Sequence, residues 1–237
     1  MNKSIANSQP PGAGILISFS GIDGAGKTTQ IEKFCTSLRM SGLTVKQFAF
    51  WDNVVAFSRF RAGFSHRFLD SEAGIGSPEK PVNRRDKNVQ KWYLSVPRAA
   101  LYCVDALNLR QTIAAARKQS SDVIVFDRYL FDQVATLPLQ LPLARRYVQA
   151  LLKIAPAPDV AYMLDADPEA ACARKPEYPV DFLHRYRASY LQLAELAGMT
   201  LVCPGPVEQV HNAIVKEFER RLISRMPASR FRSLTSV

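Results

Sequence analysis

The sequence contains little cysteine and no C-x-x-C pair, the spacing that many zinc and redox sites use. Cys35, Cys103, Cys172 and Cys203 lie far apart, each in apolar surroundings. We therefore expect buried free thiols in a reducing compartment, and the spacing disfavours zinc binding.

Long apolar runs are also absent, because no stretch reaches the roughly 18 apolar residues that a membrane helix needs. Residues 1–14 are polar and lack the apolar centre of a secretory signal, so we expect a disordered N-terminal segment. With 47% apolar residues, the chain is expected to form one globular domain over residues 15–224, followed by a basic tail at 225–237. The expected location is the cytoplasm.

Negative charge is scarce, and the formal net charge is +10. The basic residues cluster in two segments: Arg59, Arg61, Arg67, Lys80, Arg84, Arg85, Lys87 and Lys91, then Arg220, Arg221, Arg225, Arg230 and Arg232. Such a surplus suits nucleic acid, an acidic surface or an anionic small ligand; for the second cluster we favour plain solvated charge. Nucleic acid is not the expected partner, although the charge does not exclude it. Residues 70–91, rich in Gly, Pro and charge, are predicted to be a mobile loop.

The most specific pattern is Gly21-Ile22-Asp23-Gly24-Ala25-Gly26-Lys27-Thr28, which matches the phosphate-binding loop G-x-x-x-x-G-K-[ST]. A short apolar run precedes it, and apolar residues at helical spacing follow it. Glycines let backbone N–H groups approach a polyphosphate, Lys27 would reach its β- and γ-phosphates, and Thr28 would offer its hydroxyl to Mg²⁺. A glycine-rich turn without a ligand is the much less favoured alternative.

Strand-like and helical patterns alternate along the chain. Predicted strands lie at 15–20, 44–50, 122–127, 159–165 and 199–203, and predicted helices include 91–118, 180–197 and 207–223. This order predicts an α/β fold, the three-layer α/β/α fold of P-loop NTP hydrolases with a five-stranded parallel sheet. Ligands of such sheets bind at the carboxyl ends of the strands, where the Gly21 loop is expected.

Other motifs distinguish among P-loop proteins. No N-K-x-D motif is present, which argues against a GTPase. The run from Phe19 to Gln30, with its internal Asp-Gly and its Thr-Thr-Gln continuation, resembles the opening of the thymidylate kinases. Asp127-Arg128-Tyr129 is similar to that family's Asp-Arg-Tyr, and residues 164–174 are similar to its strand–Pro-Glu–helix–Arg run into a lid, here about 174–181.

The resemblance implies a nucleoside monophosphate kinase that uses ATP and Mg²⁺, acts on a small nucleotide acceptor and forms a homodimer. ATP would be bound by the loop residues Gly21, Asp23, Gly24, Ala25, Gly26, Lys27, Thr28 and Thr29. Lys27, Arg128 and Arg174 would stabilise the transferred phosphoryl group, and Thr28 and Asp127 would hold the metal. Asp23, Arg98, Tyr102 and Arg128 would bind the acceptor, with Asp23 on the 3′-hydroxyl of its sugar.

The chain departs from the family on the acceptor side. After the second predicted strand, the family has an arginine motif that grips the acceptor phosphate, whereas this chain reads Phe50-Trp51-Asp52-Asn53. Arg59 and Arg61 follow soon after and are candidate substitutes. On the long helix, Tyr102 matches the family's aromatic residue, but Ala106 stands where an arginine is expected, and Arg98 lies one turn before Tyr102.

Three functions follow from these observations. The first is transfer of the γ-phosphoryl group from ATP to thymidylate, giving dTDP and ADP. The second is a P-loop kinase for a different nucleotide or nucleoside, which the altered acceptor side favours. The third is an ATP-binding protein without kinase activity, suggested by the basic segment at 59–91.

Overall fold

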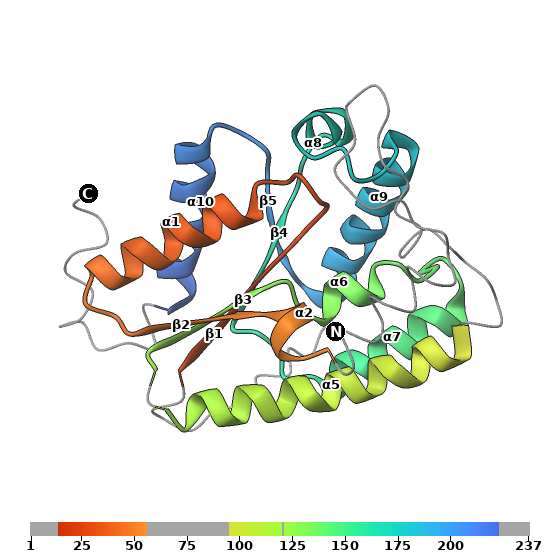
Figure 1. The fold of residues 1–237 in the computed structure, drawn as a ribbon, viewed down its shortest axis with the longest axis horizontal. Coiled ribbons are helices and arrows are strands. Elements are labelled where there is room, and N and C mark those ends of the chain that lie inside the picture. The colour runs from red at the N-terminus through yellow and green to blue at the C-terminus, as the bar shows by residue number, and fades with distance from the viewer. Residues whose placement is uncertain (1–13, 56–94, 120, 223–237) are drawn as a thin grey trace.

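The computed structural model describes residues 14–55, 95–119 and 121–222, and within these it does not describe the side chains of residues 95–98. In the described residues, five parallel strands form one sheet in the order β2-β3-β1-β4-β5. Their bounds are Ile15–Ser20 for β1, Val45–Ala49 for β2, Val123–Asp127 for β3, Val160–Leu164 for β4 and Thr200–Val202 for β5. The predicted fold class is confirmed (Figure 1).

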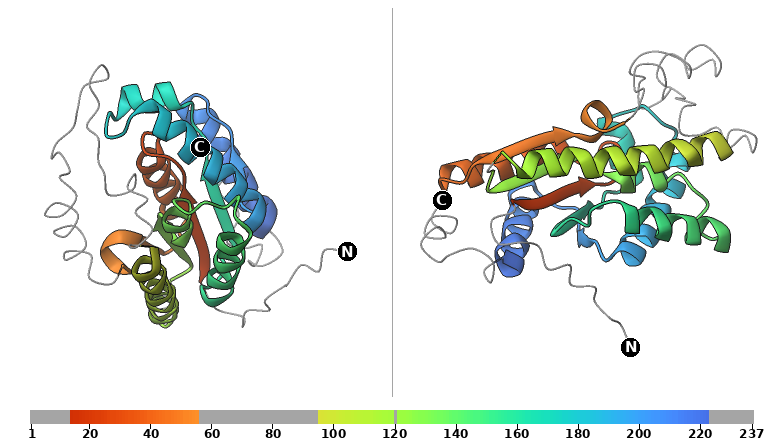
Figure 2. Two further views of the ribbon diagram at one scale, coloured as in Figure 1. Left: turned by 90° about the vertical axis from the view of Figure 1, so that its right-hand side faces the viewer. Right: turned by 90° about the horizontal axis from the view of Figure 1, so that it is seen from below.

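Helices cover both faces of the sheet (Figures 1 and 2). On one face, α1 (Lys27–Met40) and α10 (Val207–Leu222) lie side by side. The opposite side carries the others: α2 (Phe50–Asn53), α5 (Ser95–Arg117), α6 (Leu130–Val134), α7 (Pro142–Ile154), α8 (Pro168–Arg174) and α9 (Val180–Ala197). No helix in the described part of the chain is long and apolar enough to cross a membrane.

Strand β1 is buried on both faces, and its alternating side chains divide the core in two. Ile15, Ile17 and Phe19 pack with α1 and α10, while Leu16 packs with the helices of the other face. This two-sided burial explains why the central strands read as continuous apolar runs. Because β1 lies between β3 and β4, the segments that follow these three strands meet at one edge.

The sequence prediction missed α6, and the segment 1–13, the loop 70–91 and the tail 225–237 lie outside the described residues. The expectation of buried thiols holds for Cys35 and Cys172 but is wrong for Cys203, which is exposed. Cys203 follows the edge strand β5, where apolar neighbours in sequence do not guarantee cover on both faces.

Helix α8 begins with Asp167 as its N-cap. The Asp167 carboxylate accepts a hydrogen bond of 2.9 Å from the backbone N–H of Ala170, and Pro168 occupies the first turn. We expect Asp167→Ala to lower the free energy of unfolding by about 1 kcal/mol, because the cap is lost. Asp167→Ser keeps a capping oxygen and should change it by only a few tenths of that amount. Chemical denaturation of both variants measures the difference, and equal stability of the two would contradict the role of the cap.

Candidate functional site

The Gly21 loop leaves the carboxyl end of β1 and lies tightly against its neighbours. Gly21 has φ +143°, and a Cβ there would lie 2.4 Å from the carbonyl oxygen of Leu164. Gly24 has φ +85°, and its Cβ would lie 2.4 Å from the carbonyl oxygen of Ala171 in α8. A side chain at either position would therefore push the loop away from β4 or from α8.

Lys27 begins α1 and is buried, although its side chain carries a charge. Its Nζ donates hydrogen bonds of 2.8 Å to the carbonyl oxygens of Gly21 and Ile22. The ammonium group thus lies within the loop itself, at the N-terminus of a helix. The next residues, Thr28 and Thr29, are exposed on the outer side of the same turn.

Asp127 ends β3 directly beside Phe19 of β1, so its carboxylate lies close to the loop. Burial raises the pKa of Asp127, and the nearby charges of Arg128 and Lys27 lower it in part. Carboxylate and hydroxyl oxygens, the groups that Asp127 and Thr28 offer, are the ligands that Mg²⁺ prefers. The donor set therefore fits the predicted metal. Among the described residues, no cluster of three or more His, Cys, Asp or Glu side chains could hold a metal ion without further ligands.

Arg128 lies under an unusual backbone constraint. Its φ is +66°, which no other non-glycine residue shares in the described part of the chain, and its N–H donates to the carbonyl oxygen of Phe19 at 2.9 Å. The guanidinium donates from Nη2 to the carboxylate of Asp23 in the loop. The turn after β3 is thereby fastened to β1 by its backbone and to the loop by its side chain.

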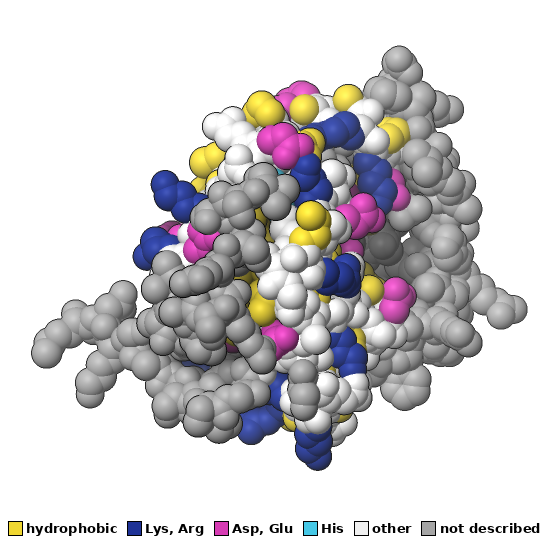
Figure 3. All heavy atoms as spheres, turned by 90° about the vertical axis from the view of Figure 1, so that its left-hand side faces the viewer, with side chains coloured by type: hydrophobic (Ala, Val, Ile, Leu, Met, Phe, Trp, Pro, Cys, Tyr) yellow, Lys and Arg dark blue, Asp and Glu magenta, His cyan; other side chains and the backbone are white. Residues whose placement is uncertain are grey.

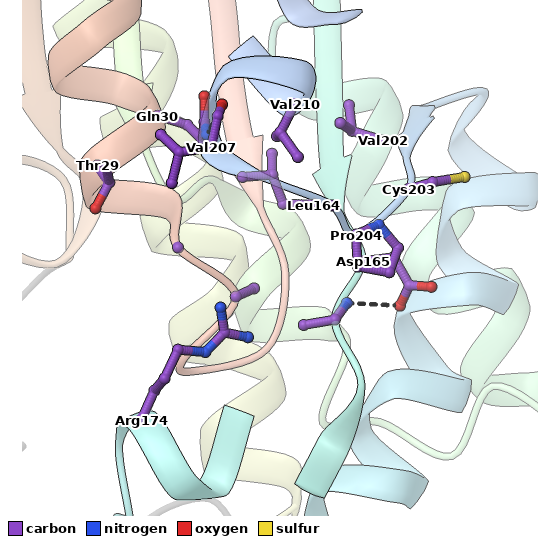
Figure 4. A pocket seen from close by; sticks show the side chains of 14 residues that line it. Thr29, Gln30, Leu164, Asp165, Arg174, Val202, Cys203, Pro204, Val207 and Val210 are labelled. Carbon is purple, nitrogen blue, oxygen red and sulfur yellow. Dashed lines mark hydrogen bonds between the residues drawn. The ribbon is translucent and has the colours of Figure 1, made fainter. Parts of the chain in front are cut away.

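A cavity of about 240 Å³ opens beside the loop (Figure 4). Its walls come from the loop and α1, from the end of β4, from α8 and from the segment between β5 and α10. Its lining residues are Ala25, Gly26, Thr29, Gln30, Leu164, Asp165, Ala166, Arg174, Val202, Cys203, Pro204, Gly205, Val207 and Val210. The predicted residue Arg174 therefore shares a cavity with the loop, and Figure 4 shows its guanidinium on the opposite side from Gln30 and Val207.

The predicted lid is a short connection between α8 and α9. Tyr178 and Glu177 in it are buried, and the ring of Tyr178 packs against Phe182 with 4.9 Å between centroids. On the other side of the cavity, Arg187 of α9 forms two hydrogen bonds of 2.6 Å with the carboxylate of Asp165. These contacts hold α9 to the end of β4, next to the cavity.

The structure brings the predicted acceptor residues together less clearly than the residues of the phosphate loop. Tyr102 is buried in the core, and its hydroxyl lies 3.5 Å from the Oγ1 of Thr136. Ala106, the position at which an arginine was expected from the resemblance, is fully buried. The roles assigned to Tyr102 and to Arg98, whose side chain is not described, stay predictions.

The described residues 50–55 after β2 contain no cation that could replace the missing arginine motif. It forms the single turn of α2, in which Phe50 is fully buried and the Asn53 side chain accepts a hydrogen bond of 2.8 Å from the N–H of Ala49. The candidate substitutes Arg59 and Arg61 lie outside the described residues.

Sequence reasoning missed Asp132, a buried acid in α6. Ser20, Tyr129 and Tyr190 donate hydrogen bonds to its carboxylate, and the Nη1 of Arg128 lies 3.5 Å away. One available signal was the pair of polar residues, Ser20 and Asp132, placed in otherwise apolar stretches. Buried polar groups need partners, so such a pair favours mutual contact.

The described residues on one face of the molecule carry charges of both signs. Figure 3 shows Lys and Arg side chains interspersed with Asp and Glu over one face. Arg220 and Arg221, from the C-terminal basic cluster, both pair with Glu217 at 2.7 and 2.6 Å. These two arginines are exposed surface residues that share one carboxylate, which agrees with the predicted solvated charge, and the rest of the cluster lies outside the described residues.

Comparison with known proteins places the site in context. The chain is 29% identical to a probable thymidylate kinase of Archaeoglobus fulgidus, over 86% of this chain and 95% of the relative. It is 28% identical to a thymidylate kinase of Bifidobacterium longum subsp. infantis, over 89% of this chain and 88% of the relative. No protein-family model matches the chain.

The fold gives the same result. The crystal structure of thymidylate kinase from Ehrlichia chaffeensis matches this structure with a TM-score of 0.56 at 15% identity, covering 87% of this chain and 99% of that one. The resemblance inferred from the motifs is thus confirmed in sequence and in fold over most of the chain.

Proposed function

We propose that this relative of the thymidylate kinases is an ATP-dependent nucleoside monophosphate kinase, with thymidylate as its first candidate acceptor. The observation that carries the proposal is the contact between the Gly21 loop and the Asp-Arg turn, in which Arg128 pairs with Asp23 beside the buried ammonium of Lys27. A P-loop protein that only binds a nucleotide has no need of a second cation fixed on the acceptor side of its loop.

On the donor side, the loop would cradle the phosphates of ATP and the cavity would receive its base. The cavity suits a flat ring, because its walls are mostly apolar and it is smaller than the roughly 300 Å³ of a pocket that holds a whole drug-sized ligand. Lys27 would exchange the carbonyl oxygens of Gly21 and Ile22 for phosphate oxygens. Arg174 lines the same cavity and would reach the phosphates from α8.

On the acceptor side, Asp23 would accept a hydrogen bond from the sugar hydroxyl, and Arg128 would lie between the two sets of phosphates. An acceptor phosphate oxygen would attack the γ-phosphorus in line, while the bond from this phosphorus to the bridging β-phosphate oxygen breaks and ADP leaves. Lys27 and Arg128 would stabilise the charge that spreads over the transferred group. Thr28 and Asp127 would hold Mg²⁺, which would supply further charge neutralisation. No protein nucleophile is required.

A second candidate is a kinase for another nucleotide or a nucleoside. It is favoured by the buried Ala106 and by the helical turn α2, neither of which supplies the arginines that the family uses on its acceptor. The third candidate, an ATP-binding protein without transfer activity, depended on the basic segment 59–91, which lies outside the described residues. A homodimer and a cytoplasmic location also stay predictions.

An acceptor screen tests these proposals. Purified protein is incubated with Mg²⁺-ATP and each deoxynucleoside and ribonucleoside monophosphate, or the free nucleosides, and the products are identified by mass. We expect ADP release that depends on an acceptor, with thymidylate turned over at least about tenfold faster than purine monophosphates, a preference of about 1.4 kcal/mol. The Lys27→Ala protein, purified in parallel, controls for contaminating kinases. Turnover of another acceptor with none of thymidylate would favour the second candidate, and no turnover of any acceptor would contradict the kinase.

A further inference from the structure

Asp132 is a fully buried carboxylate whose two oxygens have separate sets of partners. Oδ2 accepts hydrogen bonds from the hydroxyl of Ser20 at 2.7 Å and from the N–H of Tyr129 at 2.9 Å. Oδ1 accepts one from the hydroxyl of Tyr190 at 2.7 Å and faces the Nη1 of Arg128 at 3.5 Å. One oxygen therefore fixes the carboxylate to the sheet, and the other is directed at the guanidinium.

These partners come from three separate elements of the site. Ser20 is the last residue of β1 and directly precedes the Gly21 loop, while Tyr129 belongs to the turn that carries Arg128. Tyr190 lies on α9, whose Tyr186 also donates to the backbone carbonyl oxygen of Asp132 at 3.1 Å. Asp132 thus links the phosphate loop, the arginine turn and the helix that follows the predicted lid.

The position of the Arg128 guanidinium depends on this arrangement. Its Nη2 is engaged with Asp23, whereas its Nη1 is buried and forms no hydrogen bond with the described residues. Burial by itself would lower the pKa of Arg128, but the carboxylates of Asp23 and Asp132 outweigh it and raise the pKa well above its ordinary value. The guanidinium therefore stays charged between two carboxylates.

We propose that Asp132 is a positioning residue that holds Arg128 in place for phosphoryl transfer. The proposal rests on the proposed function, in which Asp23 turns to the acceptor hydroxyl and Arg128 to the phosphates. When Asp23 binds the acceptor hydroxyl, Asp132 is the anionic contact that keeps the Arg128 guanidinium from moving with Asp23. Asp132 itself does not touch the substrate and acts through Arg128.

A double-mutant cycle separates this role from a structural one. Asp132→Asn keeps the size of the side chain and removes its charge. We expect kcat to fall about 10- to 100-fold, because a small misplacement of a catalytic group has an effect of that size. The affinity for ADP should change by less than about threefold, since the amide oxygen can still accept from the Ser20 hydroxyl that precedes the loop. In the Arg128→Ala background, where there is no guanidinium to position, Asp132→Asn should lower the single-turnover rate by less than about threefold.

Asp159 provides a matched control. Its Oδ2 accepts a hydrogen bond of 2.8 Å from the N–H of Leu16 at the amino end of the sheet, opposite to the edge from which the Gly21 loop leaves. Asp159→Asn should leave kcat unchanged in both backgrounds. If Asp132→Asn lowers the rate by the same factor with and without Arg128, the residue acts independently of Arg128 and the proposal is wrong.

A measurement without substrate keeps the proposal testable in the absence of activity. The side-chain N–H signals of Arg128, assigned by their loss in Arg128→Ala, report how freely the guanidinium rotates. We expect faster rotation in Asp132→Asn, because the carboxylate that faces the guanidinium has lost its charge. If the Asp132→Asn protein does not fold, Asp132→Ser takes its place, since a serine hydroxyl can still accept a hydrogen bond from the Tyr129 N–H. Unchanged rotation would overturn the proposal, whereas altered rotation in a protein that phosphorylates no acceptor would contradict the proposed function alone.

Discussion

Lys27→Ala is expected to lower kcat for phosphoryl transfer by about 10²- to 10³-fold, the loss measured when one preorganised donor to a transition-state charge is removed. The ammonium lies at the N-terminus of α1, surrounded by the loop that would bind the phosphates. Its charge therefore acts from a buried position, where negative charge would develop. Alanine is a good helix former at this position, so α1 should persist.

The measurement is steady-state kinetics with the best acceptor of the screen, together with thermal unfolding of the same preparation. Lys33→Ala is the matched control, because Lys33 lies on the same helix but pairs with Glu208 on the surface. Such exposed pairs contribute little to stability, and kcat should not change. Near-normal activity of Lys27→Ala would show that the Gly21 loop is not the donor site.

The sheet and its loop are well predicted from sequence because both depend on local patterns. The strands β1, β3 and β4 read as apolar runs since helices cover both of their faces, and Asp167-Pro168 marks the start of α8 by cap chemistry within one turn. The loop motif likewise consists of consecutive residues. Each of these signals lies within a few residues of the structure that it specifies.

The network around Arg128 is only partly local. Asp132 lies four residues after Arg128, but it contacts Ser20 across 112 positions and Tyr190 across 58. The polar residues in these apolar stretches indicate buried polar groups, but they do not identify which distant residues are the partners. Tyr102 is ambiguous in another way, since an aromatic residue on an amphipathic helix is compatible with a ligand contact or with the core, and its burial in the structure leaves its role on the acceptor a prediction.

Arg128→Ala is expected to lower kcat by about 10³-fold or more, in the range measured for arginines that stabilise transferred phosphoryl groups. The guanidinium pairs with Asp23 and lies beside Asp132, so its removal takes away the cation and leaves the buried acid Asp132 with hydrogen-bond donors but no charge partner. The variant should therefore also unfold at a lower temperature, because a buried charge has lost its neighbour. Kinetics must accordingly be measured below the unfolding transition.

Two further substitutions separate the charge from the backbone. Arg128→Lys keeps a cation but replaces the planar fork by a point charge, and should retain more activity than alanine while remaining well below the parent. Arg128→Gly removes the side chain and also relieves the left-handed backbone at φ +66°, which disfavours residues with a Cβ by roughly 1–2 kcal/mol.

The glycine variant should thus match alanine in kcat yet be more stable to denaturant. If glycine restored activity relative to alanine, the loss in Arg128→Ala would come from a distorted turn. Equal rates for the two variants, with ADP binding intact in both, would assign the loss to the guanidinium.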